Sequence, residues 1–369
     1  MEEKLKKKII FEDGLEVTGY SFGSKANKMV EIVLNTSMVG YQEIVSDLSY
    51  TDQAVVMTYP LIGNYGMCDD DYESKNPSIS GLVVGEYCDE PSNFRCTKTL
   101  SEVMEKFNIV GVEGVDTRML ARHIRDFGSC KAYIVDASVD SRKALEELKA
   151  WNPPHDQVKR ATVKEAYTME AKGERKAKVV AIDCGMKLNI VRELTRHGCE
   201  VTVVPFDISD SEILKLNPDG VFISNGPGDP EDCVDTIKTI KELIGKVPIF
   251  GICLGHQIIS LAYGAKTYKL KFGHRGGNHP VKNLKTGKLE ITSQNHSYAV
   301  LEDTLEGTGL TVTHVNLLDN TIEGVECKKD RVFSVQYHPE SAPGPEDSNY
   351  LFDEFLKNIN ESKEEKENA

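Results

Sequence analysis

The second half of the chain alternates regularly between strand-like and helix-like segments. Short apolar runs at residues 178–184, 200–207, 220–228 and 247–253 are each followed by a stretch with helical spacing of apolar residues. Because each strand–helix–strand unit returns the chain in the same direction, this pattern predicts a parallel, doubly wound α/β sheet with right-handed crossovers. After Ala265 the pattern becomes β-rich, and one last helix is expected near the end.

The chain has 369 residues, more than one ordinary core accommodates, so two domains are expected. Residues 1–150 combine short strand-like runs with two helix-like segments, which predicts an amino-terminal α+β domain. Two prolines and a charged stretch in residues 151–177 indicate a linker. Residues 178–361 form the predicted α/β domain, and the charged residues 362–369 lack an apolar anchor and are predicted to be disordered.

The composition excludes several classes of protein. The formal net charge of -14 disfavours a nucleic-acid surface, which needs basic patches. The chain lacks the run of about 18 apolar residues that a membrane span requires, and its start lacks the apolar region of a secretory signal. Its nine cysteines include no CxxC pair, so neither a zinc ribbon nor a disulfide framework is indicated. We expect a cytoplasmic protein.

Cys253 stands between two glycines in the sequence GICLG, directly after an apolar strand run. A nucleophile on a sharp strand-to-helix turn needs small neighbours, because the backbone bends tightly and the helix packs close. The start of the following helix also favours a thiolate. A buried structural cysteine is the alternative, and it is the interpretation that we apply to the other eight cysteines.

A base for this thiol is found at the end of a later strand run. His338 is followed by Pro339, which favours an extended conformation, so that residues two positions apart point the same way. Glu340 would then lie beside the imidazole and orient it, which gives the arrangement of a nucleophile, a base and an orienting carboxylate. The alternative is a surface loop.

The sequence SNGPGDP, residues 224–230, follows another strand end. Glycine-rich turns direct backbone N–H groups inward, and the amides of Gly226 and Leu254 are candidates for an oxyanion hole. An ordinary turn is the alternative. A nucleotide site is disfavoured, because neither GxxxxGK[ST] nor a GxGxxG motif at a helix start is present.

The histidines at 274 and 279 raise the question of a metal site. We favour a structured loop, because no carboxylate or cysteine stands at ligand spacing, and we predict no metal site. His256 follows the elbow directly and is interpreted as a residue that packs or forms a hydrogen bond at the helix start.

Together these motifs resemble those of the class I, triad-type glutamine amidotransferases. The amino-terminal half adds LNTSMVGYQEIVSDLSY, MTYPLIGNYG and GVDTRMLARHIRDFG, and the second half adds FGHRGGNHPV. These stretches closely resemble the small, glutamine-hydrolysing subunit family of carbamoyl-phosphate synthases. The resemblance covers about residues 8–360.

The resemblance implies that Cys253 attacks the side-chain amide of glutamine and forms a thioester. His338, oriented by Glu340, would give a proton to the departing ammonia and later activate water. A further set of residues matches the glutamine contacts of the family: Ser49, Gly226, Gly228, Leu254, Gln257, Asn295, Ser297 and Tyr298. Because Ser49 belongs to the amino-terminal domain, the implied pocket would straddle the two domains.

The resemblance also implies a partner. The chain has no ATP-binding signature, so we expect it to hold no cofactor of its own. A large synthase subunit would bind ATP and magnesium and would combine bicarbonate with the delivered ammonia. Whether the product serves arginine or pyrimidine synthesis is open.

Three other interpretations are kept. A thiol hydrolase acting on esters or peptides would share the elbow but leave the first 150 residues unexplained. A glutaminase subunit of another synthase would share only the second half. A non-catalytic regulatory subunit would not need an intact set of Cys253, His338 and Glu340.

Overall fold

The computed structural model describes residues 5–368, which form two compact units. Unit 1 contains the described residues through Pro154 together with Lys271–Arg275, and unit 2 contains His155–Leu270 and the residues from Gly276 onward. The division between the units falls within the predicted linker. Among the described residues, no helix is both long and apolar enough to cross a membrane.

Unit 1 is built around a small barrel of mixed strands. The strands close in the order β1-β2-β8-β6-β4-β3-β9. Their bounds are β1 (Lys6–Phe11), β2 (Glu16–Gly23), β3 (Lys28–Asn35), β4 (Gln53–Met57), β6 (Gly81–Val83), β8 (Val110–Glu113) and β9 (Cys130–Asp136). The pair β1–β2 is antiparallel and the pair β3–β4 is parallel. The predicted α+β class is confirmed, although the closure into a barrel was not predicted.

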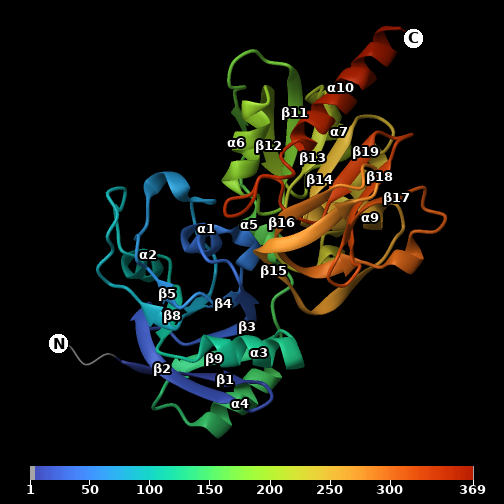
Figure 1. Ribbon diagram of the computed structural model, residues 1–369. Helices are drawn as coiled ribbons and strands as arrows, with labels where there is room; N and C mark the ends of the chain where they lie inside the picture. Colours follow the sequence, from blue (N-terminus) through green and yellow to red (C-terminus); the bar gives the residue numbers. More distant parts are fainter. Residues whose placement is uncertain (1–4, 369) are drawn as a thin grey trace. The chain divides into compact units, whose positions relative to one another are not determined.

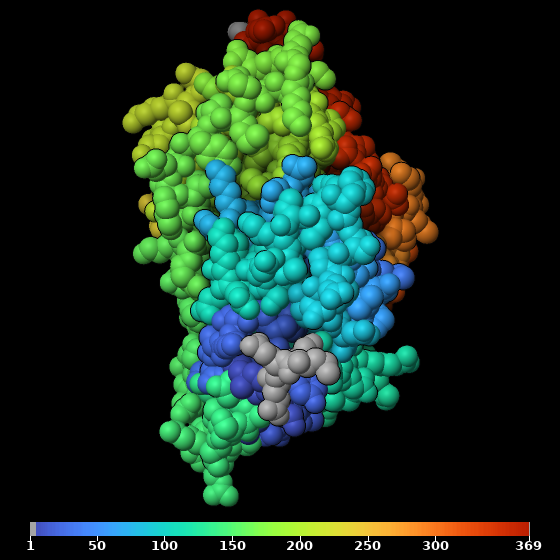
Figure 2. Space-filling view, turned by 90° about the vertical axis from the view of Figure 1, so that its left-hand side faces the viewer, coloured from blue at the N-terminus to red at the C-terminus, as the bar shows by residue number. Residues whose placement is uncertain are grey.

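Among the described residues of unit 1, four helices pack around this barrel, and short elements lie between the strands. The helices are α1 (Tyr41–Ser46), α2 (Leu100–Lys106), α3 (Thr117–Phe127) and α4 (Ser141–Ala150); the short elements are η1 (Leu48–Tyr50), β5 (Leu61–Ile62), η2 (Asp69–Asp71) and β7 (Glu86–Tyr87). Parts of the long segment between β4 and α2 reach the surface, where they contribute to the light-blue and cyan face in Figure 2.

Unit 2 contains a sheet of ten strands, with the order β10-β12-β11-β13-β14-β19-β18-β17-β15-β16. The bounds are β10 (Tyr167–Met169), β11 (Ala177–Asp183), β12 (Cys199–Pro205), β13 (Gly220–Ile223), β14 (Ile249–Ile252), β15 (Thr267–Asn283), β16 (Leu289–Val300), β17 (Thr311–Asn316), β18 (Ile322–Cys327) and β19 (Val332–Val335). The centre from β12 to β19 is parallel, and the strands beyond it are antiparallel. The predicted doubly wound sheet with a β-rich continuation is confirmed.

Helices cover both faces of the sheet of unit 2 (Figure 1). They are α5 (Gln157–Ala161), α6 (Leu188–Arg196), α7 (Asp210–Lys215), α8 (Val234–Leu243), α9 (Leu254–Ala262) and α10 (Leu351–Glu367), with single turns at η3 (Pro230–Asp232) and η4 (Glu302–Thr304). Successive strand residues point to opposite faces of the sheet and pack into two separate hydrophobic cores. On β11, Val180 and Ile182 join the core under α7, α8 and α9, whereas Val179 and Ala181 join the core under α6 and α10.

The register of the parallel strands brings distant segments to one edge. Ile223 of β13 pairs with Gly251 of β14, and Ile252 of β14 pairs with Val335 of β19. The carboxyl ends of these strands therefore meet, and ligands of open α/β sheets bind at such an edge. The motifs of unit 2 to which a chemical role is assigned from the sequence each begin within a few residues of one of these strand ends. The segment around Asn295 is the exception.

Two predicted boundaries are wrong in part. The predicted linker 151–177 is largely folded, because Val158 of α5 is buried in the core of unit 2 and β10 pairs with β12. The predicted disordered tail is helical through Glu367, since Ser362 is buried and Lys363 forms an ion pair with Asp219 at 2.9 Å. Ala369 lies outside the described residues.

Candidate active site

Cys253 sits on a strained turn between β14 and α9. Its φ of 54° and ψ of -104° place a residue with a side chain in a backbone region that normally favours glycine. Its backbone amide donates a hydrogen bond to the carbonyl oxygen of Val335 at 2.9 Å, which continues the pairing of β14 with β19 by one residue. The turn therefore fixes the start of the side chain at the carboxyl edge of the sheet.

The two flanking glycines are required by space. A Cβ atom on Gly255 would lie 2.3 Å from the carbonyl oxygen of Ile223, and one on Gly251 would lie 2.6 Å from a methyl carbon of Ile259. Both distances are too short for any side chain. The close packing of α9 on β13 and β14 thus depends on glycine at both positions, as the sequence pattern predicted.

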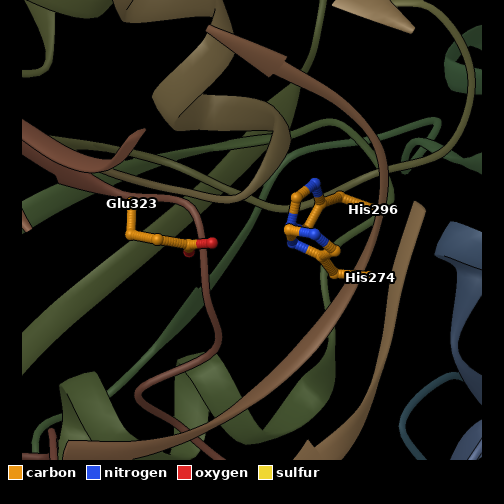
Figure 3. A group of neighbouring side chains, drawn as sticks. All are labelled: His274, His296 and Glu323. Atoms are coloured by element: carbon orange, nitrogen blue, oxygen red, sulfur yellow. The ribbon is translucent and has the colours of Figure 1, made fainter. Parts of the chain in front are cut away.

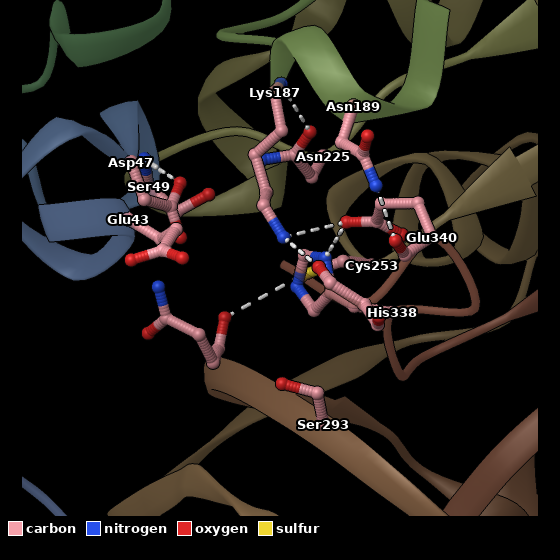
Figure 4. Close-up of polar contacts among 12 residues, drawn as sticks. Glu43, Asp47, Ser49, Lys187, Asn189, Asn225, Cys253, Ser293, His338 and Glu340 are labelled. Carbon is pink, nitrogen blue, oxygen red and sulfur yellow. Dashed lines mark hydrogen bonds and ion pairs between the residues drawn. The ribbon is translucent and has the colours of Figure 1, made fainter. Parts of the chain in front are cut away.

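His338 and Glu340 lie together after the end of β19. The Nδ1 atom of His338 is 2.6 Å from Oε1 of Glu340, and both side chains are buried. Nε2 of His338 makes no hydrogen bond that meets normal geometry with a described residue, yet Cys253 lies close enough to raise the pKa of the ring. Figure 4 shows the sulfur of Cys253 beside the imidazole, with Glu340 on the other side of the ring.

The first turn of α6 holds Glu340 from behind, which the sequence did not indicate. Nζ of Lys187 lies 3.0 Å from Oε1 of Glu340 and 2.5 Å from the carbonyl oxygen of Ser341. The side-chain amide of Asn189 donates to the backbone carbonyl of Glu340 at 2.6 Å, and Asn225 accepts from the backbone amide of Lys187 at 3.1 Å. These contacts fix the carboxylate, its backbone and its cationic partner together (Figure 4).

The charges in this group reinforce one another. Burial lowers the pKa of His338, but the neighbouring Glu340 and Cys253 outweigh burial and raise the pKa well above its ordinary value. Burial also raises the pKa of the Glu340 carboxyl, but Lys187 and His338 outweigh burial and lower it. At neutral pH the pair is therefore an imidazolium held by a carboxylate. An imidazolium stabilises a negative charge placed beside it.

The loop after β13 lies against the start of α9. A Cβ atom on Gly226 would be 2.2 Å from the carbonyl oxygen of Cys184 and 2.8 Å from a methyl carbon of Leu254. Gly226 is therefore in contact with the residue that follows the nucleophile. Leu254 is the first residue of α9, where a backbone N–H has no acceptor within its own helix. A free N–H at the helix start suits an oxyanion hole, and the use of both amides for this purpose stays a prediction.

The segment of β16 around Asn295 borders the sulfur from the other side. Sγ of Cys253 lies 3.6 Å from the carbonyl oxygen of Asn295. Gln257 of α9 donates to the carbonyl oxygen of Tyr298 at 2.8 Å, so α9 and β16 are connected next to Cys253. Of the predicted glutamine contacts on β16, Asn295 thus lies beside the sulfur and Tyr298 beside Gln257, whereas the role of Ser297 stays a prediction.

Two other predicted contacts have different surroundings. Gly228 is exposed on the loop after β13, with a φ of 89° that only glycine adopts readily. Ser49 lies in η1 of unit 1, where its backbone amide donates a hydrogen bond to Oδ1 of Asp47 at 2.9 Å. The role of Ser49 in a pocket shared by both domains stays a prediction.

The histidines that raised the metal question lie on strands. His274 and His279 both belong to β15, so the predicted loop is wrong. Figure 3 shows the side chains of His296 and Glu323 directed toward one another within unit 2. Both ring nitrogens of His296 already have hydrogen-bond partners, the carbonyl of Tyr298 at 2.7 Å and Oε1 of Gln294 at 3.0 Å. This ring serves to hold β16.

Sequence reasoning missed Lys187, Asn189 and Asn225. Lys187 follows Cys184 at the end of β11, a strand next to β13 in the sheet, so its position after a strand end was the available signal. The lysine in GMKLN belongs to no recognisable motif. Lysine is rarely buried unless it is paired, so its burial could not be predicted before its partner was known. Asn225 lies inside SNGPGDP, which was considered only for its backbone amides.

Comparisons with known proteins cover both units. Residues 9–134 match the family described as the carbamoyl-phosphate synthase small chain, CPSase domain, and residues 180–358 match the class-I glutamine amidotransferase family. The two matched regions follow one another along the chain and correspond to unit 1 and unit 2.

Similar proteins align over nearly their whole length. The carbamoyl phosphate synthase small chain of Fusobacterium nucleatum subsp. nucleatum is 53% identical, over 96% of this chain and 98% of the relative. The small chain from Bacillus cereus is 51% identical, over 98% of both chains. A pyrimidine-specific small chain from Halalkalibacterium halodurans is 52% identical, over 97% of this chain and 98% of the relative.

Proposed function

The chain belongs to the carbamoyl-phosphate synthase small-chain family, and we propose that it hydrolyses the side-chain amide of glutamine and supplies ammonia to a large synthase chain. The class-I glutamine amidotransferase match over unit 2 supports the amide as the bond that is cleaved. Within unit 2, the contact of His338 with Glu340 at 2.6 Å beside Cys253 carries the proposal.

The first half of the proposed reaction forms a thioester. The thiolate of Cys253 attacks the side-chain carbonyl carbon of glutamine, and the carbonyl oxygen becomes an oxyanion. When this tetrahedral intermediate collapses, the carbon–nitrogen bond breaks. The imidazolium of His338 donates its Nε2 proton to the leaving nitrogen, so that ammonia departs and a γ-glutamyl thioester remains.

The second half returns the enzyme to its starting state. Neutral His338 accepts a proton from water, which attacks the thioester carbon and releases glutamate and the thiolate. Glu340 stays ionised throughout and holds the ring with Nδ1 toward the carboxylate and Nε2 toward the sulfur. The ion pair with Lys187 keeps this carboxylate charged in a buried place.

The oxyanion is stabilised by the backbone amides of Gly226 and Leu254. Their mutual contact and the position of Leu254 at the start of α9 support this role. We assign the remaining contacts to the substrate by resemblance, namely Ser49, Gly228, Gln257, Asn295, Ser297 and Tyr298.

The partner follows from the chemistry of the product. Free ammonia becomes ammonium in water, so the product is useful only where a second active site consumes it. We propose a large synthase chain that holds ATP and magnesium and combines ammonia with bicarbonate in the cytoplasm. The names of the relatives as small chains support such a partner.

The experiment compares two nitrogen sources in the complex of small and large chains. Carbamoyl phosphate formation is measured with glutamine and with added ammonium salt, for the wild type and for Cys253→Ser. We expect the variant to lose glutamine-dependent synthesis and to keep ammonia-dependent synthesis. Equal loss of both would contradict the division of labour. Ester hydrolysis without release of glutamate would instead indicate a thiol hydrolase.

A further inference from the structure

Gln336 is a buried polar residue that the chemistry above does not use. It follows β19 directly, its side chain is fully buried, and its Oε1 accepts a hydrogen bond from Nε2 of Gln257 at 2.9 Å. Its own Nε2 has no hydrogen-bond partner among the residues that the structure describes. A buried amide nitrogen without an acceptor costs about 1–3 kcal/mol. Packing alone would therefore favour an apolar side chain at this position.

The free-energy cost of burying Gln336 is accompanied by a constraint that Gln336 places on the orientation of the Gln257 amide. Nε2 of Gln257 donates to the carbonyl oxygen of Tyr298 at 2.8 Å and to Oε1 of Gln336. An amide nitrogen carries two hydrogens, so both are used. If the amide turned over, its oxygen would face two other oxygens and both hydrogen bonds would be lost. Gln336 and Tyr298 together thus permit one orientation of the Gln257 amide.

The oxygen of the Gln257 amide, Oε1, is the atom that remains able to accept a hydrogen bond from a substrate. Within residues 5–368, no residue donates a hydrogen bond to Oε1 of Gln257. This oxygen is not fully buried, so it is accessible to a hydrogen-bond donor. Gln257 itself lies one turn after Cys253 on α9, with its amide against the β16 segment that borders the sulfur. The fixed orientation presents an acceptor oxygen near the nucleophile.

We infer that Gln336 is a positioning residue for the substrate. By accepting from Gln257, it holds the oxygen of the Gln257 amide toward the pocket, where that oxygen accepts a hydrogen bond from an N–H group of glutamine. This inference rests on the proposed function, because it takes Gln257 as a contact of the substrate. Gln336 acts only through Gln257 and touches neither the substrate nor Cys253.

Gln336 stands two residues before His338, so its replacement must be separated from a simple displacement of the base. A displaced His338 lowers kcat at saturating glutamine. A Gln257 amide that is free to turn over weakens binding and raises KM, while kcat changes little. The two causes therefore give different kinetic results.

The first test uses Gln336→Leu in the complex of small and large chains. We expect the KM for glutamine to rise about 10-fold, the equivalent of about one hydrogen bond, with kcat within about 2-fold of the wild type. The thermal midpoint of unfolding should change little, because the substitution removes the unpaired amide nitrogen of Gln336 but leaves one N–H of Gln257 without its acceptor. An unchanged KM would overturn the inference.

Gln336→Glu is the matched variant, for which we expect stability to change and the KM for glutamine to be retained. It keeps an oxygen that accepts from Gln257 but places an ionisable group in a fully buried position. We expect a KM close to that of the wild type and a lower thermal midpoint. A purely structural role would make KM follow stability in both variants, and that result would contradict the inference.

A double-mutant cycle tests whether Gln336 acts through Gln257. We compare Gln257→Met with the double variant Gln257→Met/Gln336→Leu. Because the first substitution removes the amide that Gln336 orients, adding the second should leave the KM for glutamine unchanged. A further rise of similar size in the double variant would overturn the inference. Absence of glutaminase activity in the wild type would instead count against the proposed function itself.

Discussion

The backbone amide of Cys253 donates a hydrogen bond to the carbonyl oxygen of Val335 at 2.9 Å. This contact joins two strand ends, at residues 253 and 335, that are 82 positions apart in the chain. His338 follows Val335 by three residues, so the pairing of β14 with β19 sets where the imidazole lies relative to the sulfur. The site is thus a consequence of sheet register.

Gly255→Ala should destroy the elbow. The new Cβ would lie 2.3 Å from the carbonyl oxygen of Ile223, and backbone atoms cannot move away without separating α9 from β13. We expect the free energy of unfolding to fall by about 1–3 kcal/mol and glutaminase activity to be lost. Chemical denaturation and glutamate release measure the two effects. Gly277→Ala is the control, because its nearest neighbour would be 3.7 Å away; an equal loss there would refute the explanation.

Lys187→Met should weaken both stability and catalysis. The substitution leaves the buried carboxylate of Glu340 without its lysine partner, and removing one member of a buried ion pair costs about 3–5 kcal/mol. Chemical denaturation should show this loss, together with a decrease in kcat for glutamine hydrolysis. Lys285→Met is the matched control, since its ion pairs with Glu326 and Glu354 are partly exposed, and we expect a loss of about 1 kcal/mol or less. Similar losses in the two variants would argue against a special role for Lys187.

Stability should decrease on mild acidification because of two buried histidines. Burial lowers the pKa of His256 to about 3, and burial together with Lys285 lowers the pKa of His314 to about 4. Below the ordinary histidine pKa of about 6.5, the unfolded chain therefore binds more protons than the folded chain. The stabilising contribution is complete above pH about 6.5 and is lost as the pH falls toward these lowered values.

The pH effect has a measurable size. From pH 6.5 to pH 5 the free energy of unfolding should decrease, with a slope of up to about 1.4 kcal/mol per pH unit for each histidine. His338 does not oppose this slope, because its pKa is raised and its contribution is already complete below pH about 6.5. Denaturation curves at several pH values test the prediction, and His314→Gln should reduce the slope. A flat profile in the wild type would contradict it.

A γ-glutamyl affinity label should modify Cys253 and none of the other eight cysteines. Burial raises the pKa of several of the others, among them Cys184, Cys199 and Cys233, so their thiols stay protonated at neutral pH. Cys253, in contrast, lies beside the imidazolium of His338. Peptide mass spectrometry after labelling identifies the modified residue. Label on a different cysteine, with Cys253 unmodified, would show that the nucleophile is assigned wrongly.

Local patterns were sufficient where the chain itself determines the geometry. The glycines around Cys253 and the strand–helix alternation predicted the elbow and the parallel sheet, because close packing and chain direction leave few alternatives. The barrel of unit 1 was missed, since its closure depends on pairings such as β1 with β9 and β2 with β8, which are distant in sequence.

Contacts made by single side chains were the least predictable. Lys187 and Gln336 stand in no motif, and their partners Glu340 and Gln257 lie 153 and 79 residues away along the chain. The helix through residue 367 was missed for a related reason. Its charged last turn is held by ion pairs with Asp219 and Arg331 of distant segments, which composition does not reveal.

The central claim is that Cys253 becomes covalently attached to the γ-carbonyl of glutamine. The most direct measurement is peptide mass spectrometry of the complex after acid quenching during turnover of glutamine. We predict a γ-glutamyl adduct on the peptide that contains Cys253. Steady release of glutamate with no adduct on that peptide, or with the adduct on another cysteine, would contradict the account.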